Sequence, residues 1–164
     1  MKINAPFLAF FPLMLAFTGD VEAGQDIQNA TGICQAALPV FDGQIRKRPL
    51  AIGNEGEASA FVSCSLRSEY LGGGLGDSIG LQVLVTNQAA GTSTINCTMV
   101  AGWEFGDTPP LYVSMSAVVA PGRSSNMYFY STEGFQNPLN LSCMLPPGTR
   151  IASILRSWFD SPEP

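Results

Sequence analysis

Short runs in which every second residue is apolar recur along the chain with turn residues between them, and helical periodicity is nearly absent. This pattern is typical of all-β proteins, because successive side chains of a strand point to opposite faces of the sheet. We therefore predict a single antiparallel β-sandwich of about eight strands, jelly-roll or immunoglobulin-like. The clearest predicted strands lie at 60–66, 79–87, 94–103, 111–119, 127–131, 140–145 and 150–158.

The alternation also predicts which side chains face the core. The inward set comprises Val62, Cys64, Leu66, Ile79, Leu81, Val83, Val85, Ile95, Cys97, Met99, Ala101, Leu141, Cys143 and Leu145. In LSCMLPPGTRIASI, residues 141–154, the apolar strand runs straight into Pro146-Pro147-Gly148, which favours a turn. The segment therefore predicts a hairpin whose first strand is stapled by a disulfide at Cys143.

The chain begins with a basic residue and a short apolar run, MKINAPFLAFFPLMLAF, followed by a small-residue site ending at Ala23. This pattern predicts a secretory signal peptide over 1–23, because Pro12 and the acidic residues after Phe17 make the run too short to span a membrane. No later segment has transmembrane length. We expect a β-sandwich domain over 24–158, a short flexible tail over 159–164, and export to the periplasm or the cell exterior.

The four cysteines all lie beyond the predicted cleavage site. An even number of cysteines in an exported chain usually forms disulfides, so two are expected. Three connectivities remain open, since spacing does not choose between them; our expectation is Cys34 with Cys64 and Cys97 with Cys143. Oxidised cysteines on apolar strand faces are structural rather than nucleophilic or metal-binding.

The charge pattern argues against a nucleic-acid partner. The net charge is −5, and the only basic cluster is Arg46-Lys47-Arg48, whereas nucleic-acid surfaces gather Lys and Arg on one face. Because Pro49 follows, the cluster predicts a charged edge strand or loop. The glycine-rich LGGGLGD at 71–77 lacks the Lys-Ser/Thr and helix of a phosphate-binding loop and predicts a surface loop.

Five segments around and after the cysteines form a recognisable order: Gly32-Ile33-Cys34-Gln35, Val62-Ser63-Cys64, Asn96-Cys97-Thr98, Leu141-Ser142-Cys143-Met144-Leu145-Pro146-Pro147 and Ile151-Ala152-Ser153. In this order the sequence resembles a family of small, exported, uncharacterised proteobacterial β-rich proteins with four cysteines. The resemblance covers about residues 31–155 and implies no activity. The sequence also has a weaker resemblance to pilin-type and spore-coat-like exported proteins.

The chain contains no histidine, which removes the commonest general base and the commonest zinc ligand. We expect no enzyme activity, no cofactor and no metal. The remaining catalytic alternative is a carboxylate-based hydrolase using Glu104 and Asp107, with Asp77 and Glu133 on other loops.

Aromatic residues supply the best candidate binding site. Trp103 lies in a predicted loop, while Tyr112, Tyr128 and Tyr130 fall on the polar faces of their strands. Exposed rings beside polar side chains stack on sugar rings; the alternative is that these rings pack under loops.

We predict a binding or surface-associated module with a glycan or cell-surface component as partner, and we leave its oligomeric state open. The alternative is a structural subunit of a surface or pilus-like assembly. The candidate ligand-binding residues are Trp103, Glu104, Asp107, Tyr112, Tyr128 and Tyr130.

Overall fold

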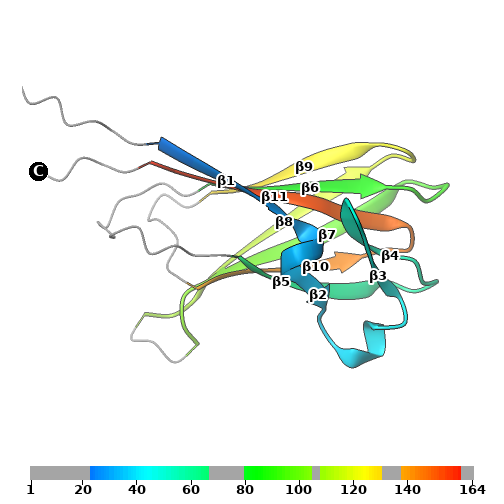
Figure 1. Cartoon of the computed structure of the whole chain (residues 1–164), viewed down its shortest axis with the longest axis horizontal. Coiled ribbons are helices and arrows are strands. Elements are labelled where there is room, and N and C mark those ends of the chain that lie inside the picture. The colour runs from blue at the N-terminus through cyan, green and yellow to red at the C-terminus, as the bar shows by residue number, and fades with distance from the viewer. Residues whose placement is uncertain (1–22, 67–79, 105–107, 131–137, 160–164) are drawn as a thin grey trace, which may run out of the picture.

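The computed structural model describes residues 23–66, 80–104, 108–130 and 138–159, which form two antiparallel β-sheets packed face to face (Figure 1). The six-stranded sheet runs in the order β3 (Ile45–Arg48), β4 (Ala51–Asn54), β11 (Thr149–Phe159), β6 (Gly80–Asn87) and β9 (Ser124–Tyr130), with β1 (Ala23–Asn29) also paired with β11. The five-stranded sheet runs β2 (Cys34–Ala36), β5 (Ala60–Leu66), β10 (Leu139–Leu145), β7 (Ser93–Ala101) and β8 (Leu111–Val119). Two short helices, α1 (Ala30–Ile33) and η1 (Pro39–Phe41), lie between strands of the N-terminal part.

The predicted antiparallel sandwich is confirmed, but the predicted number of strands was too low. The strands that were missed lie before residue 55, where the alternation is weak. All four residues of β4 are buried, so this strand has no polar face to reveal it. β3 carries the basic cluster and is the outermost strand of its sheet, which confirms the predicted charged edge strand.

The predicted hairpin around Pro146-Pro147-Gly148 was wrong. β10 pairs with β5 and β7, whereas β11 pairs with β1, β4 and β6 in the other sheet. The turn therefore carries the chain from one sheet to the other. Gly148 has a φ of 76°, a left-handed conformation that disfavours side chains and suits glycine. Alternation marks a strand and its turn, but not the sheet that the strand joins.

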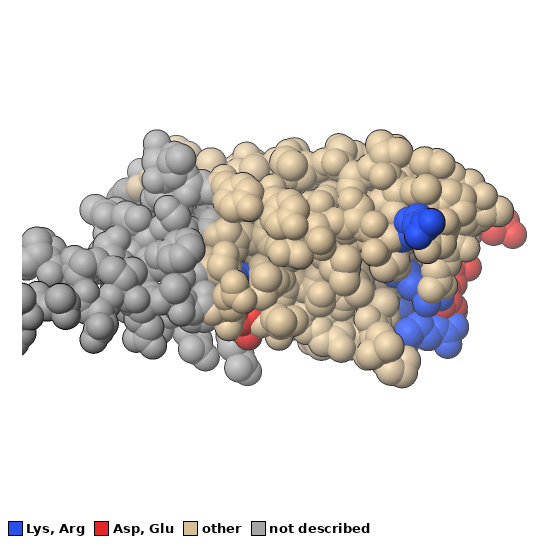
Figure 2. Space-filling model, turned by 90° about the horizontal axis from the view of Figure 1, so that it is seen from above, with Lys and Arg blue, Asp and Glu red and all other residues tan. Residues whose placement is uncertain are grey.

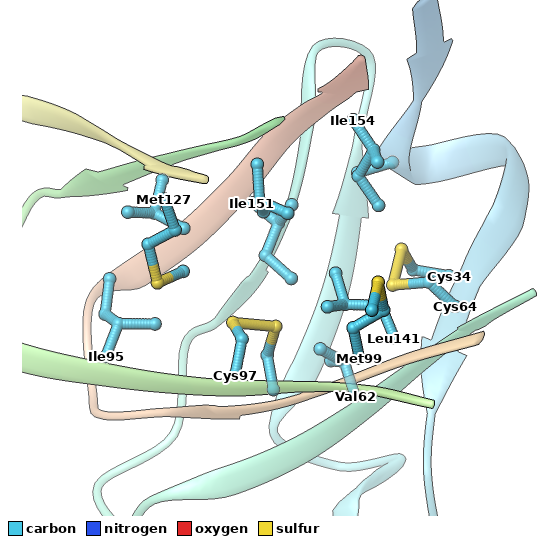
Figure 3. Packing of buried hydrophobic residues seen from close by; sticks show 14 of the residues in the cluster. Cys34, Val62, Cys64, Ile95, Cys97, Met99, Met127, Leu141, Ile151 and Ile154 are labelled. Atoms are coloured by element: carbon cyan, nitrogen blue, oxygen red, sulfur yellow. A yellow bond between two sulfur atoms is a disulfide. The ribbon is translucent and has the colours of Figure 1, made fainter. Parts of the chain in front are cut away.

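Both disulfides have the expected connectivity, Cys34–Cys64 and Cys97–Cys143. Each joins residues directly opposite one another on neighbouring strands of the five-stranded sheet, β2 with β5 and β7 with β10. In Figure 3 both cystines lie on the inner side of this sheet, facing the opposite sheet, which contributes Ile151 and Ile154 to the same core. The cystines are thus part of the apolar core and fix strand register.

Two buried asparagines join the sheets at one end of the sandwich. Asn54, the last residue of β4, donates from Nδ2 to the carbonyl oxygen of Leu145 at 2.8 Å. Asn87, the last residue of β6, donates in the same way to Val119 at 2.8 Å. Both acceptors end strands of the five-stranded sheet. Each amide therefore satisfies a carbonyl group across the core, which would otherwise be costly to bury.

Several predicted features lie outside the described residues: the signal peptide up to residue 22, the glycine-rich 71–77, Asp77, Ile79, Glu133, and the tail after Phe159. β1 begins at Ala23 and β11 ends at Phe159, directly opposite one another, so both ends of the described chain lie at the same end of the sandwich (Figure 1). Within the described ranges, no helix is long and apolar enough to cross a membrane.

Candidate functional site

The outer face of the six-stranded sheet carries a patch that we call the tyrosine face, made of Gly80, Gln82, Tyr128, Tyr130, Leu155 and Ser157. Strand register brings these residues together from β9, β6 and β11. Tyr128 lies opposite Gln82, which lies opposite Leu155. In the next row toward the end of the sheet, Tyr130, Gly80 and Ser157 are aligned in the same way.

The two tyrosines are exposed and nearly parallel. They are separated by one residue on β9, and the intervening Phe129 is buried in the core. The ring centroids of Tyr128 and Tyr130 are 6.2 Å apart and the ring planes differ by 8°. The exposed fractions are 44% for Tyr128 and 69% for Tyr130. The pair therefore presents aromatic surface to solvent and does not pack under a loop.

Gly80 lies next to both Ser157 and the ring of Tyr130. A Cβ atom at Gly80 would lie 2.8 Å from Oγ of Ser157 and 3.4 Å from Cε1 of Tyr130. The Ser157 hydroxyl donates to the Gly80 carbonyl oxygen at 3.3 Å. One edge of the Tyr130 ring therefore lies near the backbone of β6 at Gly80.

The tyrosine face contains no charged residue. Charged residues make up 13% of the chain, compared with about 25% in typical soluble domains. Figure 2 looks onto the six-stranded sheet and shows most of the visible charge gathered at one end. That end carries Arg48, which lies 2.6 Å from Glu55, and Arg150, which lies 3.6 Å from the same carboxylate. The hydrogen bond from Arg48 lowers the pKa of Glu55.

The structure separates the predicted candidate residues into two groups. Tyr128 and Tyr130 lie together on the tyrosine face. Tyr112 points outward from β8 on the opposite face of the sandwich, and its ring is also exposed. Trp103 and Glu104 are exposed just after β7 ends at Ala101, whose register partner is Leu111 at the start of β8. Asp107 lies outside the described residues.

Sequence reasoning missed Gln82, Gly80, Leu155 and Ser157. Gln82 could have been placed on the outer face of its strand, because its neighbours Leu81 and Val83 were already predicted to face inward. For Ser157 the alternation along β11 is interrupted, since the register shifts between Ile151 and Ser153. No sequence signal showed that β6 separates β9 from β11, so the composition of the face follows only from the sheet order.

The chemistry of the tyrosine face suits a ligand with an apolar flat surface and hydroxyl groups at its edges. Aromatic rings accept the apolar surface, while the amide of Gln82 and the hydroxyl of Ser157 form hydrogen bonds. The four cysteines are all oxidised. In the described ranges, no group of three or more Cys, Asp or Glu residues is placed to hold a metal ion.

Neither a protein-family model nor a curated protein matches the sequence. Among solved structures, the chain is similar to the ligand-free carbohydrate-binding module CBM1 of BiXyn10A. The TM-score is 0.51 and the identity 13%, and the match covers 80% of this chain and 96% of that module. At this identity the similarity concerns the fold alone.

Two further structures match at lower scores. One is the CBM22-2 xylan-binding domain of Paenibacillus barcinonensis Xyn10C, with a TM-score of 0.46, 10% identity, and coverage of 82% of this chain and 96% of that domain. The other contains the CBM22-1 and GH10 modules of Clostridium thermocellum xylanase 10B in complex with xylohexaose, with a TM-score of 0.46 and 15% identity. The match covers 65% of this chain but spans only 21% of the xylanase chain.

Proposed function

We propose that this protein is an exported, non-enzymatic β-sandwich module that binds an uncharged glycan on the tyrosine face. The observation that carries the proposal is the pair of exposed, nearly parallel rings of Tyr128 and Tyr130, seated beside Gly80 in a face without charges. Pyranose rings present C–H groups that pack on aromatic faces, and their hydroxyl groups pair with side chains such as Gln82. An acidic glycan would instead require Lys or Arg in the face.

The comparison with solved structures supports the same class of ligand. The chain shares the fold of CBM1 of BiXyn10A over 96% of that module, and the module belongs to a class named for binding carbohydrate. Fold alone does not decide function, since function depends on the site. The support therefore comes from the fold and the aromatic face together.

A non-enzymatic role is supported by the side chains that remain for catalysis. The sequence has no histidine, and the disulfides leave no cysteine thiolate. Glu104, one of the predicted carboxylate candidates, is exposed to solvent. Two disulfides also fit an oxidising compartment. Edman sequencing of the secreted chain tests the proposed signal peptide, with Gly24 as the expected first residue.

Isothermal titration with neutral oligosaccharides tests the binding proposal. The panel contains xylohexaose, which is bound in one of the similar structures, together with cello-, manno- and laminari-oligosaccharides. We expect one of them to bind, and Tyr128→Ala to weaken its binding at least tenfold, as is typical when a stacked ring is lost. Tyr112→Ala is the matched control, because it removes an exposed tyrosine from the opposite face. Equal affinities for the wild type and Tyr128→Ala would contradict the proposal.

A further inference from the structure

The outer strands of the two sheets differ in their protection against pairing with another chain. β3 has four residues, three of them basic, and β2 has only three residues. β9, the other outer strand of the six-stranded sheet, has seven residues and no charge or proline. β8 is the longest of the outer strands, with nine residues, LYVSMSAVV, and it also has no charge and no proline. In the part of the chain that the structure describes, β8 pairs only with β7. A long, uncharged edge of this kind favours the addition of another strand.

Apolar side chains are exposed on both faces of β8. Tyr112 and Val118 are exposed on the outer face of the sheet. On the inner face, where Ala117 and Val119 are buried, Leu111 remains 41% exposed and Met115 remains 37% exposed. The first half of β8 therefore has uncovered apolar surface on the side that faces the core, which a partner strand and its own sheet would cover.

We propose that β8 pairs antiparallel with β8 of a second copy of this chain, around a two-fold axis at Met115. The strand has nearly the same pattern of polarity when read from either end. Around this axis, Ser114 lies opposite Ser116 of the other copy, and Tyr112 lies opposite Val118. Such serine pairs and aromatic–β-branched pairs are favourable across antiparallel strands. Because both strands are uncharged, the pairing places no like charges together.

The backbone of β8 has its free groups where this register needs them. Cys97 and Cys143 have Cα atoms 4.0 Å apart, which marks a non-hydrogen-bonded pair between β7 and β10. The backbone N–H and C=O groups of Cys97 therefore point toward its other neighbour, Met115 of β8. By alternation, the groups that point to the free side of β8 belong to Tyr112, Ser114, Ser116 and Val118.

In the proposed dimer these four residues form the hydrogen-bonded pairs, and Met115 meets its own copy as a non-hydrogen-bonded pair. The strand is already held in place for this contact. Oγ1 of Thr98 lies 2.9 Å from Oγ of Ser114, and the Ser116 hydroxyl donates to Oδ1 of Asn96 at 2.6 Å. Both hydrogen bonds link β8 to β7 on the outer face of the sheet, so little ordering of β8 is required on pairing.

Directly opposite residues of an antiparallel pair point to the same side of the sheet. The two five-stranded sheets would thus form one continuous sheet, with both six-stranded sheets on the same side of it. The tyrosine faces of both copies would then point in one direction. If the glycan proposal also holds, on which this consequence rests, the dimer binds a polysaccharide surface at two sites and gains avidity.

Cysteine crosslinking tests the dimer without reference to any glycan. The wild-type chain has no free thiol, and Met115→Cys places one thiol at the two-fold axis. Leu111→Cys is the matched control, since Leu111 lies on the same face of β8 and has similar exposure. In the proposed dimer, however, the two Leu111 residues would lie eight positions apart along the paired strands. Under mild oxidation of the folded chain, we expect most of Met115→Cys to form a covalent dimer and Leu111→Cys to crosslink at least tenfold more slowly. Equal rates, or no crosslink at position 115, would overturn the proposal.

Sedimentation of Ser116→Pro provides the second test. The N–H of Ser116 points to the free side of β8, so proline removes a group that only the partner uses. We expect a concentration-dependent dimer for the wild type and for Ser116→Ala, which controls for the lost hydroxyl, and a folded monomer for Ser116→Pro. A monomeric wild type, or a dimer that persists in Ser116→Pro, would rule out this interface.

Binding to immobilised polysaccharide separates the two proposals. Ser116→Pro should bind soluble oligosaccharide as tightly as the wild type and immobilised polysaccharide at least tenfold more weakly. Tyr128→Ala should bind both the soluble oligosaccharide and the immobilised polysaccharide more weakly than the wild type. A dimer that binds no glycan would contradict the proposed function and leave the β8 interface intact. A monomer that binds glycan would contradict the β8 interface and leave the proposed function intact.

Discussion

In the five-stranded sheet, two of the four strand pairs are joined by a disulfide, whereas the six-stranded sheet has no cysteine. The six-stranded sheet instead depends on β11, which pairs with β1, β4 and β6 along its length. A slip of one residue would turn every inward side chain of a strand to the outside. One sheet therefore holds its register with covalent bonds and the other with a long central strand.

The outer faces of the two sheets also differ in composition. The five-stranded sheet has a row of small polar residues across neighbouring strands, Ser63, Ser142, Thr98 and Ser114. The six-stranded sheet has Tyr128 and Tyr130 at its edge, with Gly80 beneath. The outer face of the five-stranded sheet also exposes Tyr112 and Val118, but these lie near opposite ends of β8, so its described residues include no pair of neighbouring tyrosines. This difference indicates that the cystines maintain the fold, while the ligand site depends on packing within the other sheet.

The largest expected effect is the loss of the Cys97–Cys143 disulfide. In the chain-entropy model, replacing both cysteines with alanine lowers the free energy of unfolding by about 4 kcal/mol, since the crosslink spans 46 residues. Urea denaturation measures this change. Replacing Cys34 and Cys64 with alanine should lower the free energy of unfolding slightly less, because this disulfide spans only 30 residues. A change below about 1 kcal/mol would show that β11 and the core determine register in both sheets.

The second effect concerns the asparagines that join the sheets. Asn54→Ala removes the donor to the carbonyl of Leu145, and Asn87→Ala removes the donor to Val119. Each substitution removes a buried hydrogen bond between the sheets, so we expect the free energy of unfolding to fall by about 2 kcal/mol, as measured by urea denaturation. Asn126→Ala, at an exposed position of β9, is the control and should stay within about 0.5 kcal/mol of the wild type.

The third effect separates the ligand site from the fold. Gly80→Ala adds a methyl group next to the Ser157 hydroxyl and the Tyr130 ring, so glycan affinity should fall about tenfold. Stability should change little, because the Ser157 hydroxyl must rotate away from the new methyl group, while alanine is less flexible than glycine in the unfolded chain. Titration calorimetry and thermal melting measure the two quantities. Parallel losses of both would mean that Gly80 supports the sheet and not the orientation of the ring.

The smallest effect is a pH dependence at the charged end. The pKa of Glu55 is lowered in the folded protein, first by its hydrogen bond from Arg48. A lowered carboxyl pKa contributes stability above the unfolded pKa, and that contribution is lost as the pH falls through the folded value. We expect Glu55→Gln to be slightly less stable than the wild type at pH 7 and equal to it in acid. A difference that is independent of pH would assign the effect to packing.

Much of the fold was predictable from local alternation. The inward residues of β5, β7 and β10 were predicted correctly, because one buried face leaves a period of two in the sequence. β4 escaped prediction because both of its faces are buried. Alternation along β9 placed Tyr128 and Tyr130 on the polar face of the strand and left their exposure open; the structure shows that both are exposed.

The sequence by itself determined most strands after residue 55, their inward faces and the expected oxidised state of the four cysteines, because each depends on neighbouring residues or on composition. Only the tertiary structure decided that Pro146-Pro147-Gly148 crosses between sheets, that Gly80 lies beside Tyr130, and that β8 is the outer strand among the described strands of its sheet. The physical reason is that sheet order is set by contacts between distant segments. Such contacts leave no period in the sequence and follow from burying all strands in one core.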